Sequence, residues 1–222
     1  MLGSFAKLIA LLATATTVAA QIQSGVLFPL YIYPFQNTVC GGWTRVVDAA
    51  TSHPDLPFWL VINPDSGPGL PQTQPNFDWT PCIPQLRSAS SNVHIIGYVH
   101  TNYGAQTLDA VNTNITTYAG WSSEYRPDAP LPHKRALLLV PVLRRESYSD
   151  FNLDQLSFSS STPASKQAVV LHHGPSTTDA SLVNQLIGTD RIGAIFLTDA
   201  EYTSIPGDWD NFVDLVQAAA SA

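Results

Sequence analysis

The order of apolar runs along this chain restricts its possible folds more than any other feature. Short runs typical of buried strands alternate with segments whose apolar residues recur at helical spacing. The strand candidates are residues 26–33, 58–62, 93–99, 136–142, 168–171 and 192–197. Because these runs are apolar throughout, they predict a parallel sheet that is covered on both faces. We count six strand–helix units, and the fourth is poorly formed, since three prolines interrupt residues 122–134.

The first twenty residues predict the compartment of the protein. Lys7 precedes an apolar stretch at residues 8–13, and the small residues Val18, Ala19 and Ala20 follow. This arrangement is typical of a secretory signal peptide cleaved before Gln21. The alternative is an N-terminal anchor helix, but the apolar run is too short to span a bilayer. We therefore expect a signal peptide at residues 1–20 and one soluble domain at residues 21–222.

The composition of the chain limits the classes of molecule that it is expected to bind. The chain is 45% hydrophobic and 12% charged, which suits a large buried core and argues against disorder. Its formal net charge is −7, and loss of Lys7 with the signal peptide changes it to −8. Nucleic acids and anionic membrane surfaces are therefore poor partners, whereas neutral or cationic glycans are electrostatically acceptable.

Two cysteines and one sequon fit an oxidising, secretory route. Cys40 and Cys82 predict one disulfide, which would close a loop of about 40 residues and stabilise the fold by roughly 4 kcal/mol. Two buried free thiols are the alternative. Asn114, in the triplet Asn-Ile-Thr, is a predicted N-glycosylation site.

Polar and aromatic residues follow the predicted strands, where parallel α/β folds bind their ligands. The main ones are Tyr31, Tyr33, Asn63, Asp65, Tyr98, His100, Tyr103, Glu146, Tyr148, His172, His173, Asp199 and Tyr202. Aromatic faces combined with amide, imidazole and carboxylate groups suit sugar rings, which present apolar faces and hydroxyl edges. We therefore expect a sugar-binding rim at the carboxyl ends of the strands.

Other types of site find little support. His172, His173 and Asp179 could suggest a metal, but neighbouring strand residues point to opposite faces, so no metal site is predicted. Gly67 and Gly69 lie in a proline-rich loop and do not form a phosphate-binding turn. The sequence has no G-x-S-x-G nucleophile elbow, and paired cysteines would not act as nucleophiles. No cofactor is predicted.

An ordered series of motifs carries a family resemblance. The motifs are LYIYP at residues 30–34, VINP at 61–64, SGPG at 66–69, IGYVHTNYG at 96–104, YAGW at 118–121 and IFLTD at 195–199. In this order they resemble the spherulation-specific family 4, or spherulin-4-like proteins, over most of the chain after the signal peptide.

The resemblance implies both a fold and an activity. It implies an eight-stranded (β/α) TIM barrel related to glycoside hydrolases that cut α-linked, galactosamine-containing fungal polysaccharide. The implied mechanism is retaining, in which one carboxylic acid protonates the leaving oxygen and a second carboxylate, about 5 Å away, attacks the anomeric carbon. The implied partner is a polysaccharide or cell-wall glycan outside the cell.

The chain departs from the family at one place. Family members carry an aliphatic-Phe-Phe-Asp-Glu strand soon after the YAGW position and then a strand ending in Asn-Pro-Gly, and this sequence contains neither. About two of eight strand–helix units are therefore missing between Trp121 and Ala136. Either an internal segment has been lost from the sequence, or the chain is a degenerate, non-catalytic paralogue. Because six units cannot close an eight-stranded barrel, we expect open sheet edges and poor expression.

These observations assign the candidate site. Glu146 and Asp199 are the candidate catalytic carboxylates, and the substrate groove is predicted to include Tyr33, Asn63, Tyr98, His100 and Tyr103. The predicted function is that of a secreted glycoside-hydrolase-like protein that is impaired or inactive because the Asp-Glu pair is missing. The alternative is a non-catalytic glycan-binding protein, or a structural protein of the cell wall or of development.

Overall fold

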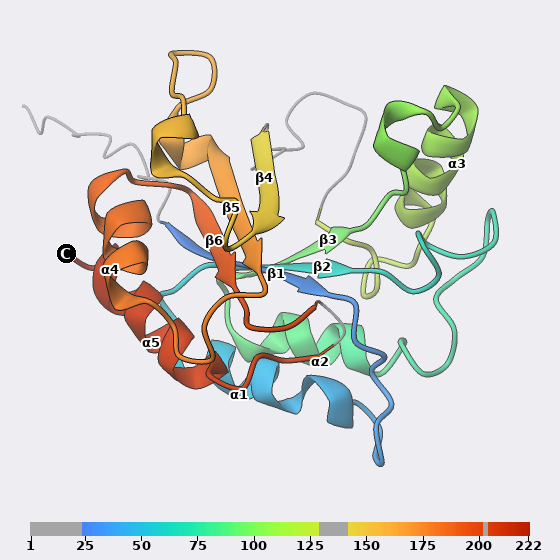
Figure 1. Cartoon of the computed structure of the whole chain (residues 1–222). Coiled ribbons are helices and arrows are strands. Elements are labelled where there is room, and N and C mark those ends of the chain that lie inside the picture. Colours follow the sequence, from blue (N-terminus) through green and yellow to red (C-terminus); the bar gives the residue numbers. More distant parts are fainter. Residues whose placement is uncertain (1–23, 129–141, 202–203) are drawn as a thin grey trace, which may run out of the picture.

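The computed structural model describes residues 24–128, 142–201 and 204–222, in which six parallel strands form one sheet (Figure 1). The strands are β1 (Gly25–Leu30), β2 (Phe58–Ile62), β3 (Val93–Gly97), β4 (Val142–Ser147), β5 (Gln167–His172) and β6 (Ala194–Leu197). Five of them overlap the predicted runs. The fourth prediction, residues 136–142, lies almost entirely outside the described residues, and the observed β4 begins where that prediction ends.

The strand order is that of a barrel opened along one seam. Neighbours in the sheet follow the order β3-β2-β1-β6-β5-β4, so the first and last strands of the chain pair with each other. In this pairing Gly25 lies opposite Ala194, and Val26 lies opposite Ile195. A (β/α) barrel closes by pairing its first and last strands. Since β3 and β4 form the two edges of the described sheet, the opening falls where two missing units were expected, and the prediction of an incomplete, TIM-barrel-like α/β fold is confirmed.

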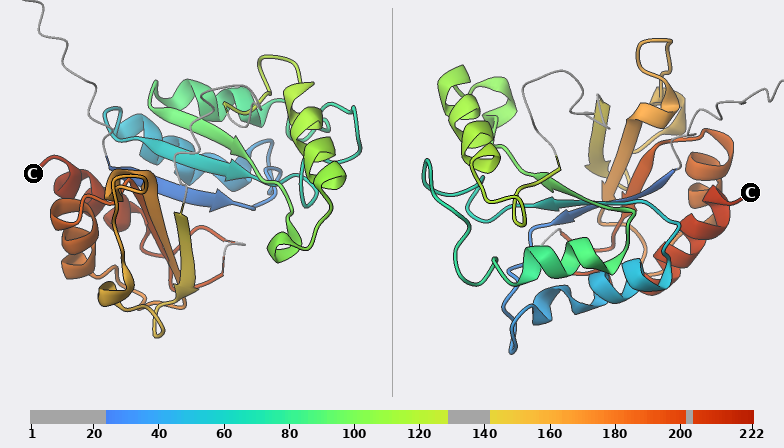
Figure 2. Two further views of the ribbon diagram at one scale, coloured as in Figure 1. Left: turned by 90° about the horizontal axis from the view of Figure 1, so that it is seen from above. Right: turned by 180° about the vertical axis from the view of Figure 1, so that it is seen from behind.

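Helices cover the sheet between successive strands. They are α1 (Thr44–Ser52), α2 (Cys82–Ala89), α3 (Leu108–Ala119), α4 (Ala180–Val183) and α5 (Trp209–Ala220), and a π-helical segment (Asn184–Thr189) continues α4. Short 3₁₀ turns lie at Gly41–Trp43, Asn102–Gly104, Leu153–Gln155 and Ala164–Lys166. Figure 2 shows α1, α2 and α5 side by side along one face of the sheet, while α3 stands near the end of β3.

Aromatic side chains fill the core between the sheet and α5. The ring of Phe28 lies 4.8 Å from that of Phe196 and 5.0 Å from that of Trp209, and Phe212 packs against both Phe196 and Trp209. All four side chains are fully buried. Buried aromatic side chains contribute large apolar areas, so this cluster joins the last helix to the centre of the sheet.

The two faces of β3 are covered unequally. Val93, Ile95 and Gly97 are buried on one face, while Tyr98 and the side chains that alternate with them remain partly exposed on the other. The expectation of a sheet covered on both faces therefore holds only in part for this strand. The physical reason is its position at the edge of the described sheet, where it has a strand neighbour, β2, on one side only.

Asp128 occupies part of the free edge of β3. Its backbone N–H donates to the carbonyl of Ile95 over 2.8 Å, and its carboxylate accepts the N–H of Ile95, also at 2.8 Å. Arg87, at the end of α2, forms an ion pair with the same carboxylate. Both backbone groups of Ile95 therefore have partners at the edge where a further strand would pair in a closed barrel.

A disulfide joins Cys40, just before the turn at Gly41–Trp43, to Cys82 at the start of α2, at a sequence separation of 42. No helix among the described residues is long and apolar enough to cross a membrane. The predicted signal peptide, residues 1–20, lies outside the described residues.

Candidate functional site

All six strands are parallel, so their carboxyl ends meet at one edge of the molecule, which we call the carboxyl-end rim. It consists of the residues that directly follow the strands or end them: Tyr31, Tyr33, Asn63, Tyr98, His100, Glu146, Tyr148, His172, His173, Thr198, Asp199 and Glu201. Most of the predicted site residues belong to this set.

Two tyrosines from different strands meet at the rim. The rings of Tyr31, after β1, and Tyr98, after β3, contact each other edge to face with centroids 5.4 Å apart. Both side chains are half-buried, and the N–H of Tyr98 extends the β3 ladder by donating to the carbonyl of Ile62. A paired aromatic surface of this kind can pack against the apolar face of a sugar ring. Tyr31 was not among the predicted groove residues, although its place after the first apolar run was a usable signal.

Two other predicted groove residues make contacts within the protein. The Tyr33 hydroxyl donates to the Asp78 carboxylate, and this hydrogen bond raises the pKa of Tyr33. The side-chain oxygen of Asn63 accepts the N–H of Gly67 over 2.8 Å and so shapes the loop after β2. Both side chains therefore hold loops at the rim in place. Tyr33 nevertheless remains accessible to a ligand, since 45% of its surface is exposed.

The loop after β3 carries the remaining groove candidates. His100 is exposed, and the backbone of Tyr103 lies in the 3₁₀ turn at Asn102–Gly104. The side chain of Tyr103 is outside the part that the structure describes.

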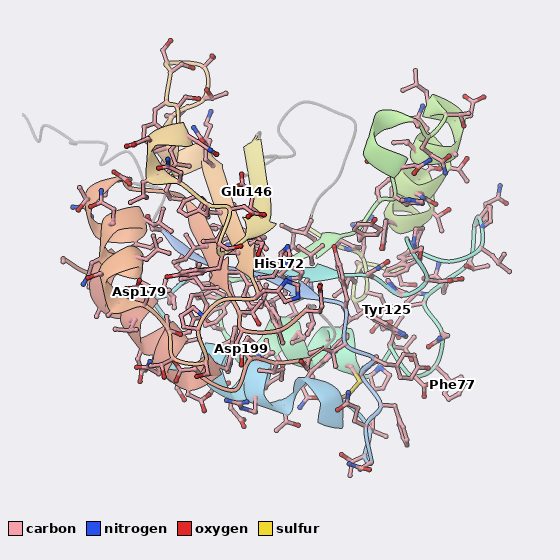
Figure 3. All side chains as sticks on the ribbon, viewed as in Figure 1. Phe77, Tyr125, Glu146, His172, Asp179 and Asp199 are labelled. Atoms are coloured by element: carbon pink, nitrogen blue, oxygen red, sulfur yellow. A yellow bond between two sulfur atoms is a disulfide. The ribbon has the colours of Figure 1, made fainter. Side chains whose placement is uncertain are left out.

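Glu146 and Asp199 lie on strands that are separated by β5. Glu146 pairs with Leu171 of β5, and Leu171 pairs with Leu197 of β6, so these three residues share one face of the sheet. Asp199 lies two residues beyond Leu197 and is exposed. The rim therefore brings the two candidate carboxylates to the same end of the sheet, with one strand between them (Figure 3).

A small pocket lies between the loops that follow β5 and β6. Three carboxylates line it, those of Asp179, Asp199 and Asp208, together with Tyr148. Its free volume is about 10 Å³, roughly the room needed for one water molecule. A sugar ring does not fit this pocket, so any sugar site at this end of the protein must use the open rim.

Asp179 and Asp208 serve as acceptors for the surrounding backbone. Asp179 caps α4 by accepting the N–H groups of Ser181 and Leu182, and it also accepts the Tyr148 hydroxyl at 2.9 Å. Asp208 accepts the N–H of Thr178 at 2.7 Å. These hydrogen bonds, chiefly from the Leu182 and Thr178 backbone respectively, lower the pKa of both carboxyls. A general acid needs a raised pKa, so neither group suits that role.

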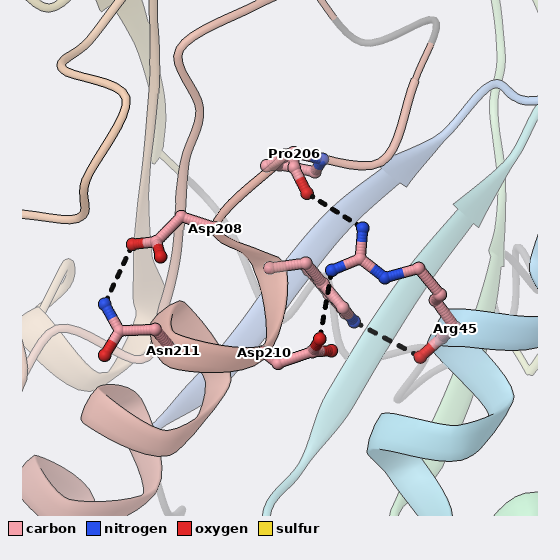
Figure 4. A network of polar contacts seen from close by, with 6 residues as sticks. Arg45, Pro206, Asp208, Asp210 and Asn211 are labelled. Carbon is pink, nitrogen blue, oxygen red and sulfur yellow. Dashed lines mark hydrogen bonds and ion pairs between the residues drawn. The ribbon is translucent and has the colours of Figure 1, made fainter.

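Arg45 holds the loop after β6 against α1 (Figure 4). Its guanidinium donates to the carbonyl of Pro206 over 3.2 Å and forms an ion pair with Asp210 at 3.1 Å, and the Trp209 indole N–H donates to the carbonyl of Arg45 itself. Nearby, Asn211 donates to Asp208. These contacts hold Pro206 and the first turn of α5 against α1.

His172 and His173 lie on the same side of the chain, with their Nδ1 atoms 2.8 Å apart. The expectation that their rings point to opposite faces is wrong, because His173 has a φ of 56° and so leaves the extended strand conformation. Glu201 lies beyond His173, with its Oε1 3.1 Å from the Nε2 of that ring. Strand alternation alone could not reveal this turn.

Asn114, the predicted glycosylation site, lies within α3. Its side chain is partly buried, and a Cβ added at Gly67 would lie 3.2 Å from its Nδ2 atom. Its modification stays a prediction.

Comparisons with known proteins agree with the fold described above. Residues 25–130 match the model of the spherulation-specific family 4. Spherulin-4 of Physarum polycephalum is 37% identical over 94 residues, which are 42% of this chain and 25% of that protein. The chain thus matches about a quarter of the length of that relative.

The fold also matches a solved structure, that of Aspergillus clavatus Sph3 in complex with GalNAc. The TM-score is 0.69 with 26% identity, and the match covers 88% of this chain and 98% of that chain. The resemblance deduced from the motifs is confirmed. Residues 25–130 of this protein therefore match the spherulation-specific family 4, and the fold of the chain is similar to that of Sph3.

Proposed function

We propose that this protein binds an amino-sugar-containing polysaccharide at its carboxyl-end rim and that its capacity for hydrolysis is impaired. The observation that carries the proposal is the likeness to Sph3, whose structure holds GalNAc, together with a rim where the Tyr31–Tyr98 pair accompanies Glu146 and Asp199. The predicted signal peptide, the disulfide and the Asn114 sequon support action outside the cell or at the cell wall.

The chemistry of the rim supports an amino sugar as the ligand. Tyrosine rings pack against the apolar face of a pyranose, and their hydroxyls hydrogen-bond with its edge. Carboxylates accept hydrogen bonds from sugar hydroxyls and attract the ammonium group of a sugar that lacks its acetyl group. The formal net charge of −7 favours such a cationic polymer over an anionic one.

The carboxylates that the chain retains are the reason to expect impaired hydrolysis. A retaining glycosidase needs a protonated acid and a nucleophile about 5 Å apart. The sequence lacks the family's Asp-Glu pair, and the pKa values of Asp179 and Asp208 are shifted downward, away from those of an acid. Glu146 and Asp199 come from strands that are separated by β5.

Binding is tested by calorimetric titration of the secreted, disulfide-intact protein with galactosamine and N-acetylgalactosamine oligosaccharides. We expect Tyr98→Ala to weaken binding about tenfold, since the rim loses one stacking ring. Phe158→Ala is the matched control, because Phe158 is 46% exposed near the opposite end of the sheet, where Gln167 at the start of β5 bonds to the neighbouring Ser157. Equal affinity in the wild type and Tyr98→Ala would contradict the proposal.

Residual hydrolysis is the second candidate function, favoured by the position of Glu146 and Asp199 at the same end of the sheet. Release of reducing ends from the same oligosaccharides, lost in Glu146→Gln and Asp199→Asn with binding retained, would establish it. Binding without any release would select the non-catalytic role. Absence of both would leave a structural protein of the cell wall.

A further inference from the structure

Three metal-ligating side chains gather at the rim, and none of them is among the rim residues to which glycan contacts are assigned above. His172 ends β5, His173 follows it, and Glu201 lies in the loop after β6. One ligand atom from each residue can be chosen so that all three lie within 4.8 Å of one another. The group therefore joins two loops that are far apart in the sequence.

The backbone holds these loops together independently of the three side chains. The N–H of Gly174, after β5, donates to the carbonyl of Thr198, after β6, over 2.9 Å. The N–H of Tyr148 donates to the carbonyl of His172 over 2.8 Å. The left-handed conformation of His173 then turns its ring beside that of His172, with centroids 4.6 Å apart. The cluster is thus placed by backbone pairing between strand ends.

The residue types select a class of ion. Two imidazoles and one carboxylate are a common set of protein ligands for zinc, which leaves a fourth position open. Calcium and magnesium prefer oxygen ligands throughout, so they fit this set poorly. Zinc–ligand bonds of about 2.0–2.1 Å in a tetrahedron place ligand atoms roughly 3.3 Å apart. Rotation of the side chains can bring the three groups to that spacing, because His173 and Glu201 expose 54% and 53% of their side-chain surface.

We propose that His172, His173 and Glu201 bind a divalent transition-metal ion of the zinc type at the carboxyl-end rim. The ion would take one nitrogen from each imidazole and a carboxylate oxygen from Glu201, in place of the present contacts His172–His173 and His173–Glu201. Its open position would hold water or another small donor. The proposal does not depend on glycan binding.

The test uses the secreted, disulfide-intact protein without an affinity tag, after dialysis against a chelator. Zinc is titrated by calorimetry, and cobalt is titrated by visible absorption, which reports the coordination geometry. We expect one ion per chain, and at least tenfold weaker zinc binding in both His173→Ala and Glu201→Gln. Thermal unfolding of each variant without metal shows whether the fold is retained, and Glu201→Gln serves as the conservative replacement.

The matched control is His53→Ala. His53 pairs with Asp214 at 2.9 Å between α1 and α5, so it is a second histidine–carboxylate pair away from the rim. We expect this variant to bind zinc as the wild type does. Failure of the wild type to bind zinc, undiminished binding in folded His173→Ala, or an equal loss in His53→Ala would overturn the proposal.

Discussion

The side chain of Asp179 has two structural roles, as a helix cap and as a hydrogen-bond acceptor for a neighbouring tyrosine. It caps α4 through the N–H groups of Ser181 and Leu182 and accepts the hydroxyl of Tyr148, which follows β4. Burial, followed by this hydrogen bond, raises the pKa of Tyr148 to about 12. In the sequence, Asp179 stands out only as a candidate metal ligand, although an aspartate before a helical segment is also a typical N-cap.

The first prediction concerns Asp179 and pH. Because its pKa is lowered from 3.8 in the folded state, its contribution to stability is fully present above pH 3.8 and is lost as the pH falls below that value. We expect Asp179→Ala to lower the free energy of unfolding by about 1 kcal/mol at neutral pH, since the helix loses its cap. Urea unfolding at a series of pH values should show this difference shrinking in acid.

Asp179→Asn provides the control. Asparagine caps helices about as well as aspartate but does not titrate. We expect a smaller loss at neutral pH and no acid-dependent change from this position. A difference between the wild type and Asp179→Ala that stays constant down to low pH would contradict the assignment.

At the scale of elements, Gly97 allows α3 to pack against β3. The Tyr118 ring lies so close to Gly97 that a Cβ there would approach a ring carbon to 2.7 Å. Tyr118 is buried, and its hydroxyl donates to the carbonyl of Ile62 at 3.4 Å. A glycine near the end of a predicted strand suggests a close approach, but the approaching residue could not be named from the sequence.

The second prediction is that Gly97→Ala lowers the free energy of unfolding by about 1–3 kcal/mol, because the ring of Tyr118 must move. Gly207→Ala is the control, since a Cβ at Gly207 would have no heavy atom within 4 Å. Chemical denaturation of both variants measures the difference. Equal effects at the two glycines would argue against the packing described.

At the scale of the whole molecule, β3 and β4 form the two edges of the sheet that the described residues make. Unpaired strand edges favour association with other chains, which is why poor expression was expected. Asp128 counters this at β3 by pairing with both backbone groups of Ile95, and Arg87 supports it. The expression level itself stays a prediction.

The third prediction is that Asp128→Ala leaves the buried N–H of Ile95 without its partner and costs about 1–3 kcal/mol. We also expect more oligomer in size-exclusion chromatography, because the β3 edge becomes available for pairing. Asp109→Ala, on the exposed first turn of α3, is the control and should stay close to the wild type. A monomeric Asp128→Ala protein of unchanged stability would contradict this role of Asp128.

The fourth prediction concerns the disulfide. Because it closes a loop of about 42 residues, replacing both Cys40 and Cys82 by alanine should cost about 4 kcal/mol. Thermal unfolding of this variant should match that of the wild type in a reducing agent. An oxidised wild type that unfolds at the same temperature as the variant would rule out a stabilising role.

The sequence by itself determined the class of fold, the order of strands and helices, the family resemblance and the place where the described sheet is open. These follow from local periodicity and from motifs that are contiguous in the chain. Only the tertiary structure decided the Tyr31–Tyr98 contact, the joining of His172 and His173 with Glu201, and the cover that Asp128 gives to β3. The physical reason is that these features depend on strand register and on single backbone turns, which bring together residues far apart in the chain.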